Sequence, residues 1–586
     1  MDFKISTKIA ALVVLGTFEA NNVWADTIPA AATPDQVSRE LSTEMPQPQA
    51  RPLTPIQAPE EAAPSPLMEQ AKKIKFELNG IVLSGNKTIP TSELEQIYKK
   101  DLHKTITVAD LFNIIQTITN YYRNKGYIIS RAVLPPQHVK GGIVHVQVIE
   151  GYLGDVIVTG NPRGAKCLVQ SFGKQITKER PLEISRMEKY LTLANEIPAT
   201  SVRAVLSPSK KLPGAADLNL VTQNRLITGY VSYDNYGTLY IGPQQMTANL
   251  GVNSVLNSGD ATQITFTKTP RGGELTYTDI NYDAALNDRG WRYTLGGTRA
   301  HTHPLFILQS QQVDGVNMNY YANLNVPVIR SRAETLTLQA TFNYLDSQVN
   351  NFGNFELYTD HLRSVGLGAI YNFADKFFGA NLLSGQVRQG LPLFGYSSNY
   401  NPDTATTSRP GGRGDYTKFD VTASRLQAIK GPISVYGIFR GQWAFNPLLS
   451  SEQFTFGGSQ LGRGYDVAEL IGDRGASASV ELRYDMPFEK FFVQNVQAYI
   501  FYDGGSIWNY KSITGIPTKQ TALSTGIGAR FYCTRWVSGN IMWAQPITKQ
   551  VSALQATSQF VSFGATTNRG NGAAPRVFFS IVAQLD

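Results

Sequence analysis

The chain has 586 residues and a formal charge of +8 at pH 7, and only 17% of its residues are Asp, Glu, Lys or Arg. This charged fraction is below the roughly 25% typical of soluble globular domains, and no Lys/Arg cluster lies within a nucleic-acid-binding motif. Cys167 and Cys533 lack the spacing of a zinc site or a disulfide framework. Composition therefore argues against nucleic acid as a partner and against both kinds of cysteine site.

Residues 1–25 are organised like a cleaved signal peptide. Lys4 and Lys8 precede the apolar run 9–18, and Ala25 ends a stretch with the small residues that signal peptidase needs. The run is about half of the roughly twenty residues that a spanning helix needs. We expect the mature chain to begin at Asp26. Because only helices and closed barrels satisfy their backbone in lipid, a membrane form of this chain would span with strands, which indicates a Gram-negative outer membrane or its periplasmic side.

Residues 26–73 are rich in Pro, Ala, Gln and Glu. The stretch Asp35 to Met45 is compatible with a short polar helix capped by Asp35, and Pro46 to Pro66 is too proline-dense for anything but an extended linker. Two interpretations stay open, a disordered tail and a docked helix on a tether.

Residues 76–161 have the pattern of a compact α+β unit. Strands are expected at 76–83, 128–134 and 143–149, and helices at 90–100 and after Thr107, where Thr107 and Asp110 form a capping box. A second pass through the same order follows, with strands at 156–158, 202–206 and 217–221 and helices at 165–172 and 184–195. We predict two tandem modules that differ in sequence.

From residue 226 to the end, the chain reads almost entirely as amphipathic strands. The clearest are Thr335 to Tyr344 and Ser479 to Met486, in which apolar and polar side chains alternate without error. This pattern fits strands with lipid outside and a wet lumen inside, and taken alone it also fits a soluble β-sandwich. The signal peptide, the number of strands and the aromatic-rich strand ends favour a barrel. At about 23 residues per strand and turn, we expect roughly sixteen strands.

A glycine-rich stretch, 457–465, interrupts these strands and is predicted to be a loop. It holds Arg463 between two glycines, ahead of Tyr465, and a guanidinium placed in this way can approach a carboxylate closely. The candidate carboxylate is Asp503. If Ile500 and Tyr502 face lipid, then Phe501 and Asp503 face the lumen, where a loop folded inward can meet them. The alternative is a solvated arginine at a loop tip.

Other motifs carry little chemistry. None of the six histidines stands in a metal-binding pattern, and the sequence contains no nucleophile elbow and no phosphate loop. We therefore expect no enzyme activity, no cofactor and no metal. The tripeptide Arg413-Gly414-Asp415 is interpreted as a chance match to an integrin-type element.

Several of these residues carry a resemblance to a known family. Residues 118–127, with the run Tyr122 to Tyr127, followed by 131–137, Gly141-Gly142 and 148–151, resemble the first POTRA domain of two-partner secretion transporters, the haemolysin and filamentous-haemagglutinin exporters called TpsB. Arg463-Gly464-Tyr465 resembles that family's conserved-loop motif. Phe501 to Gly505 resembles its second barrel motif, F-x-D-x-G.

The resemblance implies an all-β transmembrane barrel of about sixteen antiparallel strands, preceded by two periplasmic α+β POTRA domains and an N-terminal helix that can plug the pore. The implied function is export of one large β-helical partner, the TpsA exoprotein, without nucleotide. The implied partners also include outer-membrane lipid and the barrel-assembly machinery. Tyr127, Arg131 and Gln137 either touch the exported protein or fix a turn.

These predictions divide the chain into five parts: a signal peptide (1–25), a plug helix with linker (26–73), POTRA domain 1 (74–151), POTRA domain 2 (152–225) and the barrel (226–586). Six residues form the expected pair of motifs in the loop and lumen: Phe501, Asp503 and Gly505 on one side, Arg463, Gly464 and Tyr465 on the other. Two other functions remain as alternatives. A BamA- or TamA-like assembly factor shares the barrel motifs but usually carries three or more POTRA domains, and a diffusion porin does not account for the modules.

Overall fold

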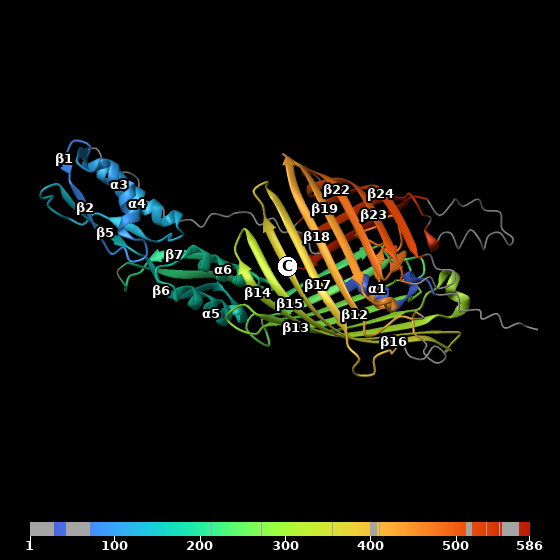
Figure 1. Ribbon diagram of the computed structural model, residues 1–586. Coiled ribbons are helices and arrows are strands. Elements are labelled where there is room, and N and C mark those ends of the chain that lie inside the picture. Colours follow the sequence, from blue (N-terminus) through green and yellow to red (C-terminus); the bar gives the residue numbers. More distant parts are fainter. Residues whose placement is uncertain are drawn as a thin grey trace, which may run out of the picture.

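The computed structural model describes residues 28–42, 71–212, 214–270, 272–353, 355–398, 407–409, 411–490, 492–510, 518–534, 536–549, 551–553 and 574–585. Two small α+β modules lead into one closed barrel, and a short N-terminal helix lies among the barrel strands (Figure 1). The predicted signal peptide and most of the predicted linker fall outside the described residues. Among the described residues, no helix has the length and hydropathy needed to cross a bilayer.

The first module packs two helices against two small sheets. Its three-stranded sheet has the order β2-β5-β4, and β1 pairs with β3 in a separate ribbon. The elements are β1 (Lys75–Leu78), β2 (Gly80–Ser84), α3 (Thr91–Tyr98), β3 (Lys104–Thr107), α4 (Val108–Asn124), β4 (Arg131–Val133) and β5 (Ile143–Ile149).

The prediction of one strand over 76–83 is wrong. The chain changes sheets at Asn79, whose backbone N–H donates to the Gly142 carbonyl at 2.8 Å, so β1 and β2 take different partners. Strand β3 was not predicted, because four residues between two helices give too short an alternation to detect. Strand β4 is shorter than predicted, since the N–H of Ser130 donates to the Tyr127 carbonyl in a turn.

Helix α4 begins where its capping box was predicted. Thr107 accepts from the Asp110 N–H at 3.1 Å, and Asp110 accepts from the Thr107 N–H at 2.9 Å. The helix then buries one face, including Leu111, Ile118 and Tyr122, against the sheet. The cap thus fixes the register with which this apolar face meets the core.

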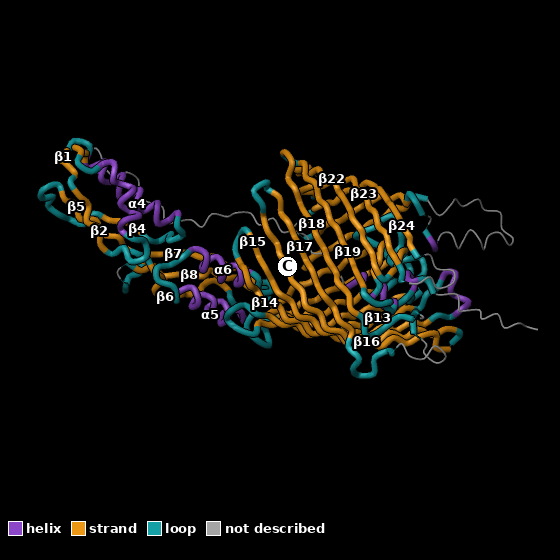
Figure 2. The backbone as a smooth tube through the Cα atoms, viewed as in Figure 1, coloured by secondary structure: helices purple, strands orange, loops and turns teal. Residues whose placement is uncertain are grey.

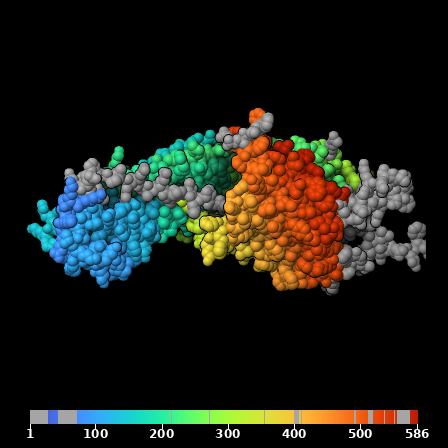
Figure 3. Space-filling view, turned by 90° about the horizontal axis from the view of Figure 1, so that it is seen from above, coloured from blue at the N-terminus to red at the C-terminus, as the bar shows by residue number. Residues whose placement is uncertain are grey.

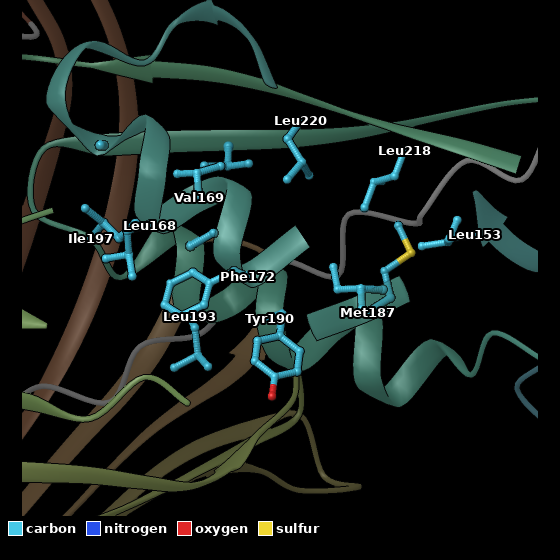
Figure 4. Packing of buried hydrophobic residues seen from close by; sticks show 14 of the residues in the cluster. Leu153, Leu168, Val169, Phe172, Met187, Tyr190, Leu193, Ile197, Leu218 and Leu220 are labelled. Carbon is cyan, nitrogen blue, oxygen red and sulfur yellow. The ribbon is translucent and has the colours of Figure 1, made fainter. Parts of the chain in front are cut away.

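The second module has the order strand, two helices, two strands, without the β1–β3 ribbon of the first module. Its sheet has the order β6-β8-β7, and α5 and α6 bury Phe172, Met187 and Leu193 against it (Figure 4). The elements are β6 (Tyr152–Asn161), α5 (Lys166–Thr177), α6 (Ile184–Asn195), β7 (Thr200–Pro208) and β8 (Ala215–Asn224).

The barrel contains sixteen strands, each antiparallel to its neighbours, and closes where β26 pairs with β9. In Figure 2 these strands run obliquely, side by side, around the barrel. They are β9 (Ile227–Asp234), β10 (Gln245–Asn253), β11 (Ala261–Lys268), β12 (Leu275–Ala285), β13 (Arg292–Thr302), β14 (Asp314–Arg330), β15 (Glu334–Asn351), β16 (Phe355–Ala374), β17 (Gly379–Gly390), β18 (Thr417–Lys430), β19 (Ile433–Ala444), β22 (Arg474–Lys490), β23 (Val493–Trp508), β24 (Lys519–Tyr532), β25 (Val537–Pro546) and β26 (Arg576–Leu585).

The predicted fold class, a sixteen-stranded barrel behind two α+β modules, is confirmed. The two strands read most clearly from the sequence lie inside β15 and β22, which extend beyond the predicted ranges. Alternation also sets the faces of β23, because Ile500 and Tyr502 are half exposed on the outside while Tyr499 and Phe501 are buried inside. The inner face of β23 therefore carries the polar and aromatic half of this strand.

The second module rests on the barrel turns nearest to it (Figure 3). Arg330, at the end of β14, forms an ion pair with Glu196 after α6, with Nε 3.0 Å from Oε1. Gly290, in the turn between β12 and β13, lies so close to Leu193 that a Cβ there would be 2.6 Å from a Leu193 methyl carbon. Polar and apolar contacts together hold this module against one part of the rim.

The capping box makes the start of α4 sensitive to pH. Hydrogen bonds from Thr107 hold the pKa of Asp110 below its ordinary value, so the stabilisation by the carboxylate is complete above about 3.9, the unperturbed value for Asp, and is lost as the pH falls through the lowered pKa. We expect hydrogen-exchange protection of the first turn of α4 to fall over this acidic range in the wild type. In Asp110→Asn that dependence should be absent.

Asp101→Asn changes a neighbouring acid outside the box and is the matched control. Exchange is followed by mass spectrometry on peptides covering residues 105–115, after correction for the intrinsic rate at each pH. An Asp110→Asn profile that follows the wild type would contradict this account of the cap.

Candidate functional site

The connection between β19 and β22 turns back into the barrel instead of projecting from it. It is stiffened by a short ribbon in which β20 (Phe454–Phe456) pairs with β21 (Leu470–Gly472). The predicted loop lies between these two strands. Gly457 has φ 115°, and a Cβ there would lie 2.1 Å from the Asp466 carbonyl oxygen, so only glycine fits at this turn.

Arg463 and Asp503 meet inside the barrel. Nε of Arg463 lies 3.0 Å from Oδ2 of Asp503, and Nη2 lies 2.7 Å from Oδ1. The backbone N–H groups of Gly462 and Arg463 also donate to Oδ2, at 3.1 and 3.0 Å. Only 5% of Arg463 and none of Asp503 is exposed. The carboxylate therefore receives four hydrogen bonds from the loop in a site shielded from water.

A second carboxylate shares the guanidinium and was not predicted. Glu481 on β22 forms an ion pair with Nη1 of Arg463, and Nη2 donates to Ser479 Oγ at 2.8 Å. Glu481 is also paired with Arg483 at 2.7 Å and with Arg530 at 3.2 Å. The signal for this partner was present, because the predicted alternation of β22 places Ser479, Glu481 and Arg483 on its polar face.

Aromatic side chains enclose this charged cluster. The Arg463 Cζ lies 3.6 Å from the centre of the Phe501 ring, a cation–π contact whose strength rises when water is excluded. Tyr465 donates its hydroxyl to the Leu523 carbonyl at 2.8 Å and packs against Phe456. Both predicted aromatic residues thus bind the loop to the wall.

The two predicted glycines are places of close approach. A Cβ on Gly464 would lie 2.9 Å from the backbone nitrogen of Pro546 in β25. On Gly505, a Cβ would lie 2.3 Å from the Phe456 ring. The structure therefore brings all six predicted loop and lumen residues into one site.

The N-terminal helix α1 (Pro34–Ser42) lies in the same lumen. Of the two interpretations left open by the sequence, the docked helix is the one observed. The prediction that Asp35 caps it is wrong, because Pro34 already occupies a helical position, where its missing N–H costs nothing, and Asp35 lies in the first turn.

Contacts of α1 extend from the strand wall to the loop. Gln36 donates to the Ser450 carbonyl at 2.6 Å, and Val37 joins an apolar cluster with Tyr277 and Leu308. At the other end, Glu40 accepts hydrogen bonds from the N–H and hydroxyl of Ser459, at 3.1 and 2.9 Å. The helix therefore touches the glycine-rich loop directly.

The three predicted residues of the first module lie far along the chain from this site and do different things. Gln137 donates to the His145 carbonyl at 2.6 Å and accepts from the His145 N–H at 2.8 Å, as a paired strand residue would. Tyr127 packs edge-on against Tyr122, and Arg131 is exposed on β4. The geometry of Gln137 favours the turn-fixing interpretation for that residue.

The side chains of the Arg-Gly-Asp tripeptide bind each other. Arg413 Nε and Nη2 lie 2.8 and 2.6 Å from the two carboxylate oxygens of Asp415. Among the residues described, no group of three or more His, Cys, Asp or Glu side chains is arranged to hold a metal ion.

Comparisons with known proteins bear on both the barrel and the modules. The family model described as haemolysin secretion/activation protein ShlB/FhaC/HecB matches residues 214–531, and the model described as POTRA domain, ShlB-type, matches residues 76–151. The heme/hemopexin transporter protein HuxB of Haemophilus influenzae (strain 86-028NP) is 23% identical over 562 residues, which cover 93% of this chain and 96% of HuxB. The outer membrane transporter CdiB of Escherichia coli is 24% identical over 460 residues, covering 73% of this chain and 72% of CdiB.

Solved structures share the fold. CdiB from Escherichia coli superposes with a TM-score of 0.67 at 18% identity, over 92% of this chain and 94% of CdiB. BamA from Haemophilus ducreyi, lacking POTRA domains 1–3, gives a TM-score of 0.51 at 14% identity, over 87% of this chain and all of that one. At these identities the likeness concerns the fold alone.

Because Arg463 faces two carboxylates, a simple charge swap will not restore the site. Arg463→Asp leaves Asp503 and Glu481 buried without their shared cation, which costs roughly 3 to 5 kcal/mol when a buried pair is broken from one side. Adding Asp503→Arg restores one pair but leaves the new aspartate beside Glu481. We expect partial recovery of barrel stability in this double variant, compared with either single variant.

The stability is read as the temperature at which the folded band is lost in heat-modifiability gels. Full recovery in the double variant would mean that Glu481 does not act on position 463. No recovery in the double variant would argue against a direct Arg463–Asp503 pair.

Adjacent glycines on β23 offer a test of the close approach to Phe456. Gly505→Ala places a methyl group in the Phe456 ring, whereas Gly504→Ala meets only the end of the Leu523 side chain, at 2.8 Å. We expect Gly505→Ala to loosen the loop, measured as faster proteolysis between residues 457 and 469, and Gly504→Ala to leave it protected. Equal protection in the two variants would refute this role of Gly505.

Proposed function

The chain belongs to the ShlB/FhaC/HecB family of haemolysin secretion/activation proteins, which are outer-membrane transporters with periplasmic POTRA domains, and from this we propose that it exports one large β-helical exoprotein to the cell surface without nucleotide. The observation that carries the proposal is that α1 and the glycine-rich loop lie in one lumen and touch through Glu40 and Ser459. In this proposal α1 is the plug and the loop is the lock.

The plug is held mainly by polar contacts. Gln36, Arg39 and Glu40 each make hydrogen bonds to the loop region, and apolar contact comes from Ala31, Ala32 and Val37, with Ile28 and Leu41 packed beside them. Although Gln36 is only 1% exposed, a hydrogen bond contributes a net free energy of only about 1 kcal/mol, because the same groups bond to water when they are released. A client whose own polar groups take over these hydrogen bonds can therefore displace α1 step by step.

The covalent link lets the plug leave without disturbing the modules. Residues 43–70 join α1 to the first module and lie outside the described residues. A chain of this length reaches roughly 90 to 100 Å when extended, several times the roughly 30 Å thickness of a bilayer core. Release of α1 thus needs no unfolding of the POTRA domains.

The lock resists partial movement. A loop that withdraws Arg463 leaves Asp503 in a dry site without a cation, at the high cost of an uncompensated buried charge, whereas Glu481 keeps Arg483 and Arg530. Movement therefore requires that another cation or water reach Asp503 as the loop departs. We assign Arg463, Gly464, Tyr465, Phe501, Asp503 and Gly505 to this lock.

Client capture is assigned to the POTRA domains, with 74–151 and 152–225 as the two units. Within the described residues, β2 pairs only with β5 and β6 pairs only with β8, which leaves one edge of each strand open to an added strand. Val82 on β2 and Ile157 on β6 are 45% and 51% exposed, and can supply apolar contact. Tyr127, Arg131 and Gln137 shape the opposite edge, at β4.

The names of the relatives refer to different transported systems: heme/hemopexin for HuxB, and haemolysin for HpmB of Proteus mirabilis. We propose a dedicated exoprotein as the client and leave its activity to experiment. Comparison of the secreted and outer-membrane proteomes of the native host, with and without this gene, tests the function. Loss of one large protein from the medium, with fragments in the periplasm, is the expected result.

Other outcomes of that comparison would overturn the proposal. Broad depletion of outer-membrane barrels would mean an assembly factor, and an unchanged proteome would mean a porin. Complementation with the wild-type gene is the control.

The plug assignment makes a separate prediction for conductance. Glu40→Ala removes both hydrogen bonds to Ser459, and we expect a larger open fraction in single-channel recordings from planar bilayers. Ser42→Ala is the matched control, because Ser42 is exposed and its hydroxyl contacts only the Arg39 carbonyl of its own helix. Equal open fractions in the wild type and in Glu40→Ala would show that Glu40 does not hold the plug in place.

A further inference from the structure

The outer wall of the barrel carries an apolar concavity of about 640 Å³ across strands β19 and β22–β25. This volume falls within the roughly 300 to 1,000 Å³ typical of small-molecule sites, which are mostly apolar. Its lining includes Tyr484, Ala498, Ile527, Ala529, Ile541 and Trp543. Because the wall faces the membrane, the surrounding medium is lipid.

Two small residues form the floor of the concavity. Ala498 and Ala529 stand opposite each other in the β23–β24 register, and both share the outward face of their strands with Ile500 and Ile527, which are 51% and 56% exposed. Ile541, which is 53% exposed, is the next residue in the same row, opposite Ala529. The two alanines leave a hollow in the outer surface because longer side chains surround them.

The inner face behind the floor is covered by a tyrosine ring. Inside the barrel, Tyr499 lies over Gly528, where a Cβ would come within 2.4 Å of the tyrosine ring. Gly528 and Tyr499 both reach the lining of the concavity. Gly528 inside and Ala529 outside are neighbouring positions of β24, so the floor consists of the strand backbone with the Tyr499 ring behind it.

The depth of the concavity identifies the leaflet. Strand β9 follows the second POTRA domain and so begins at the periplasmic end, and the strands then alternate in direction. Ile433, the first residue of β19, and Phe531, next to the end of β24, both line the hollow and both lie at that end. The concavity therefore opens into the inner, periplasmic leaflet.

We infer that this concavity binds one acyl chain of an inner-leaflet glycerophospholipid. The ligand class follows from an apolar lining, a lipid-facing opening and a position away from the leaflet that contains lipopolysaccharide. The aromatic rings of Tyr484 and Trp543 border the hollow and give it a fixed shape, because aromatic side chains lose little rotamer freedom. The site does not depend on export, and its test uses no secreted protein.

Trp543 provides the measurement, since it is 40% exposed at the edge of the hollow. The purified full-length protein in lipid-depleted detergent is titrated with a phospholipid carrying a brominated acyl chain. The share of tryptophan fluorescence due to Trp543 is obtained by subtracting a Trp543→Phe variant. We expect quenching of that share to saturate near one phospholipid per barrel.

Filling the floor supplies the matched comparison. Ala529→Leu should bind about tenfold more weakly, because displacing roughly two methylene groups of the chain removes that much contact. Ala369→Leu is the control. Ala369 stands opposite the outward, 46% exposed Leu338 on another part of the wall, and this variant should bind as the wild type does. Ala498→Leu serves as the second filling variant if Ala529→Leu does not give a folded band in heat-modifiability gels.

Three results would overturn the inference. Quenching that rises in proportion to the brominated lipid without saturating would indicate ordinary boundary lipid. Unchanged affinity in both filling variants would place the bound lipid elsewhere. Saturation by lipopolysaccharide but not by phospholipid would assign the hollow to the other leaflet.

Discussion

The interior of this barrel is organised by one guanidinium shared between two buried carboxylates. Arg463 satisfies Asp503 in a bidentate manner and reaches Glu481 with its remaining nitrogen. A buried carboxylate without a cation is costly. Glu481 also has Arg483 and Arg530 from the wall, but among the described residues Asp503 forms its ion pair with Arg463 alone. The chain supplies this cation from a loop, and the loop therefore folds inward.

The same constraint explains the composition of the surrounding wall. A loop that packs against strands needs space. Glycine provides it at Gly464, next to the backbone of Pro546, and at Gly505, next to the Phe456 ring. Helix α1 lies beside the loop and uses backbone carbonyls and a serine of the loop region as its partners. Plug and loop are in this sense two parts of one interior, although more than 400 residues of chain separate them.

The parts of this structure that depend on short-range sequence pattern could be predicted from the sequence. Alternation predicted the barrel, its approximate strand number and the inward face of Asp503, and the Thr107–Asp110 box predicted the start of α4. Features that depend on many contacts between distant residues could not be predicted. Glu481 was assigned to the correct face of β22, but its ion pair with Arg463 was not predicted. The break between β1 and β2 at Asn79 depends on which strands pair with each of them. Strand β3 has four residues, too few for a periodicity to be detected.

The tether has a thermodynamic consequence for α1. Because residues 43–70 keep the helix attached, its return to the lumen is an intramolecular event governed by an effective concentration that the length of the link sets, and not by how many copies of the protein the membrane contains. In the proposed export cycle, a helix held by polar contacts would then close its own barrel after each client has passed. Each chain would bring one such helix to its own pore.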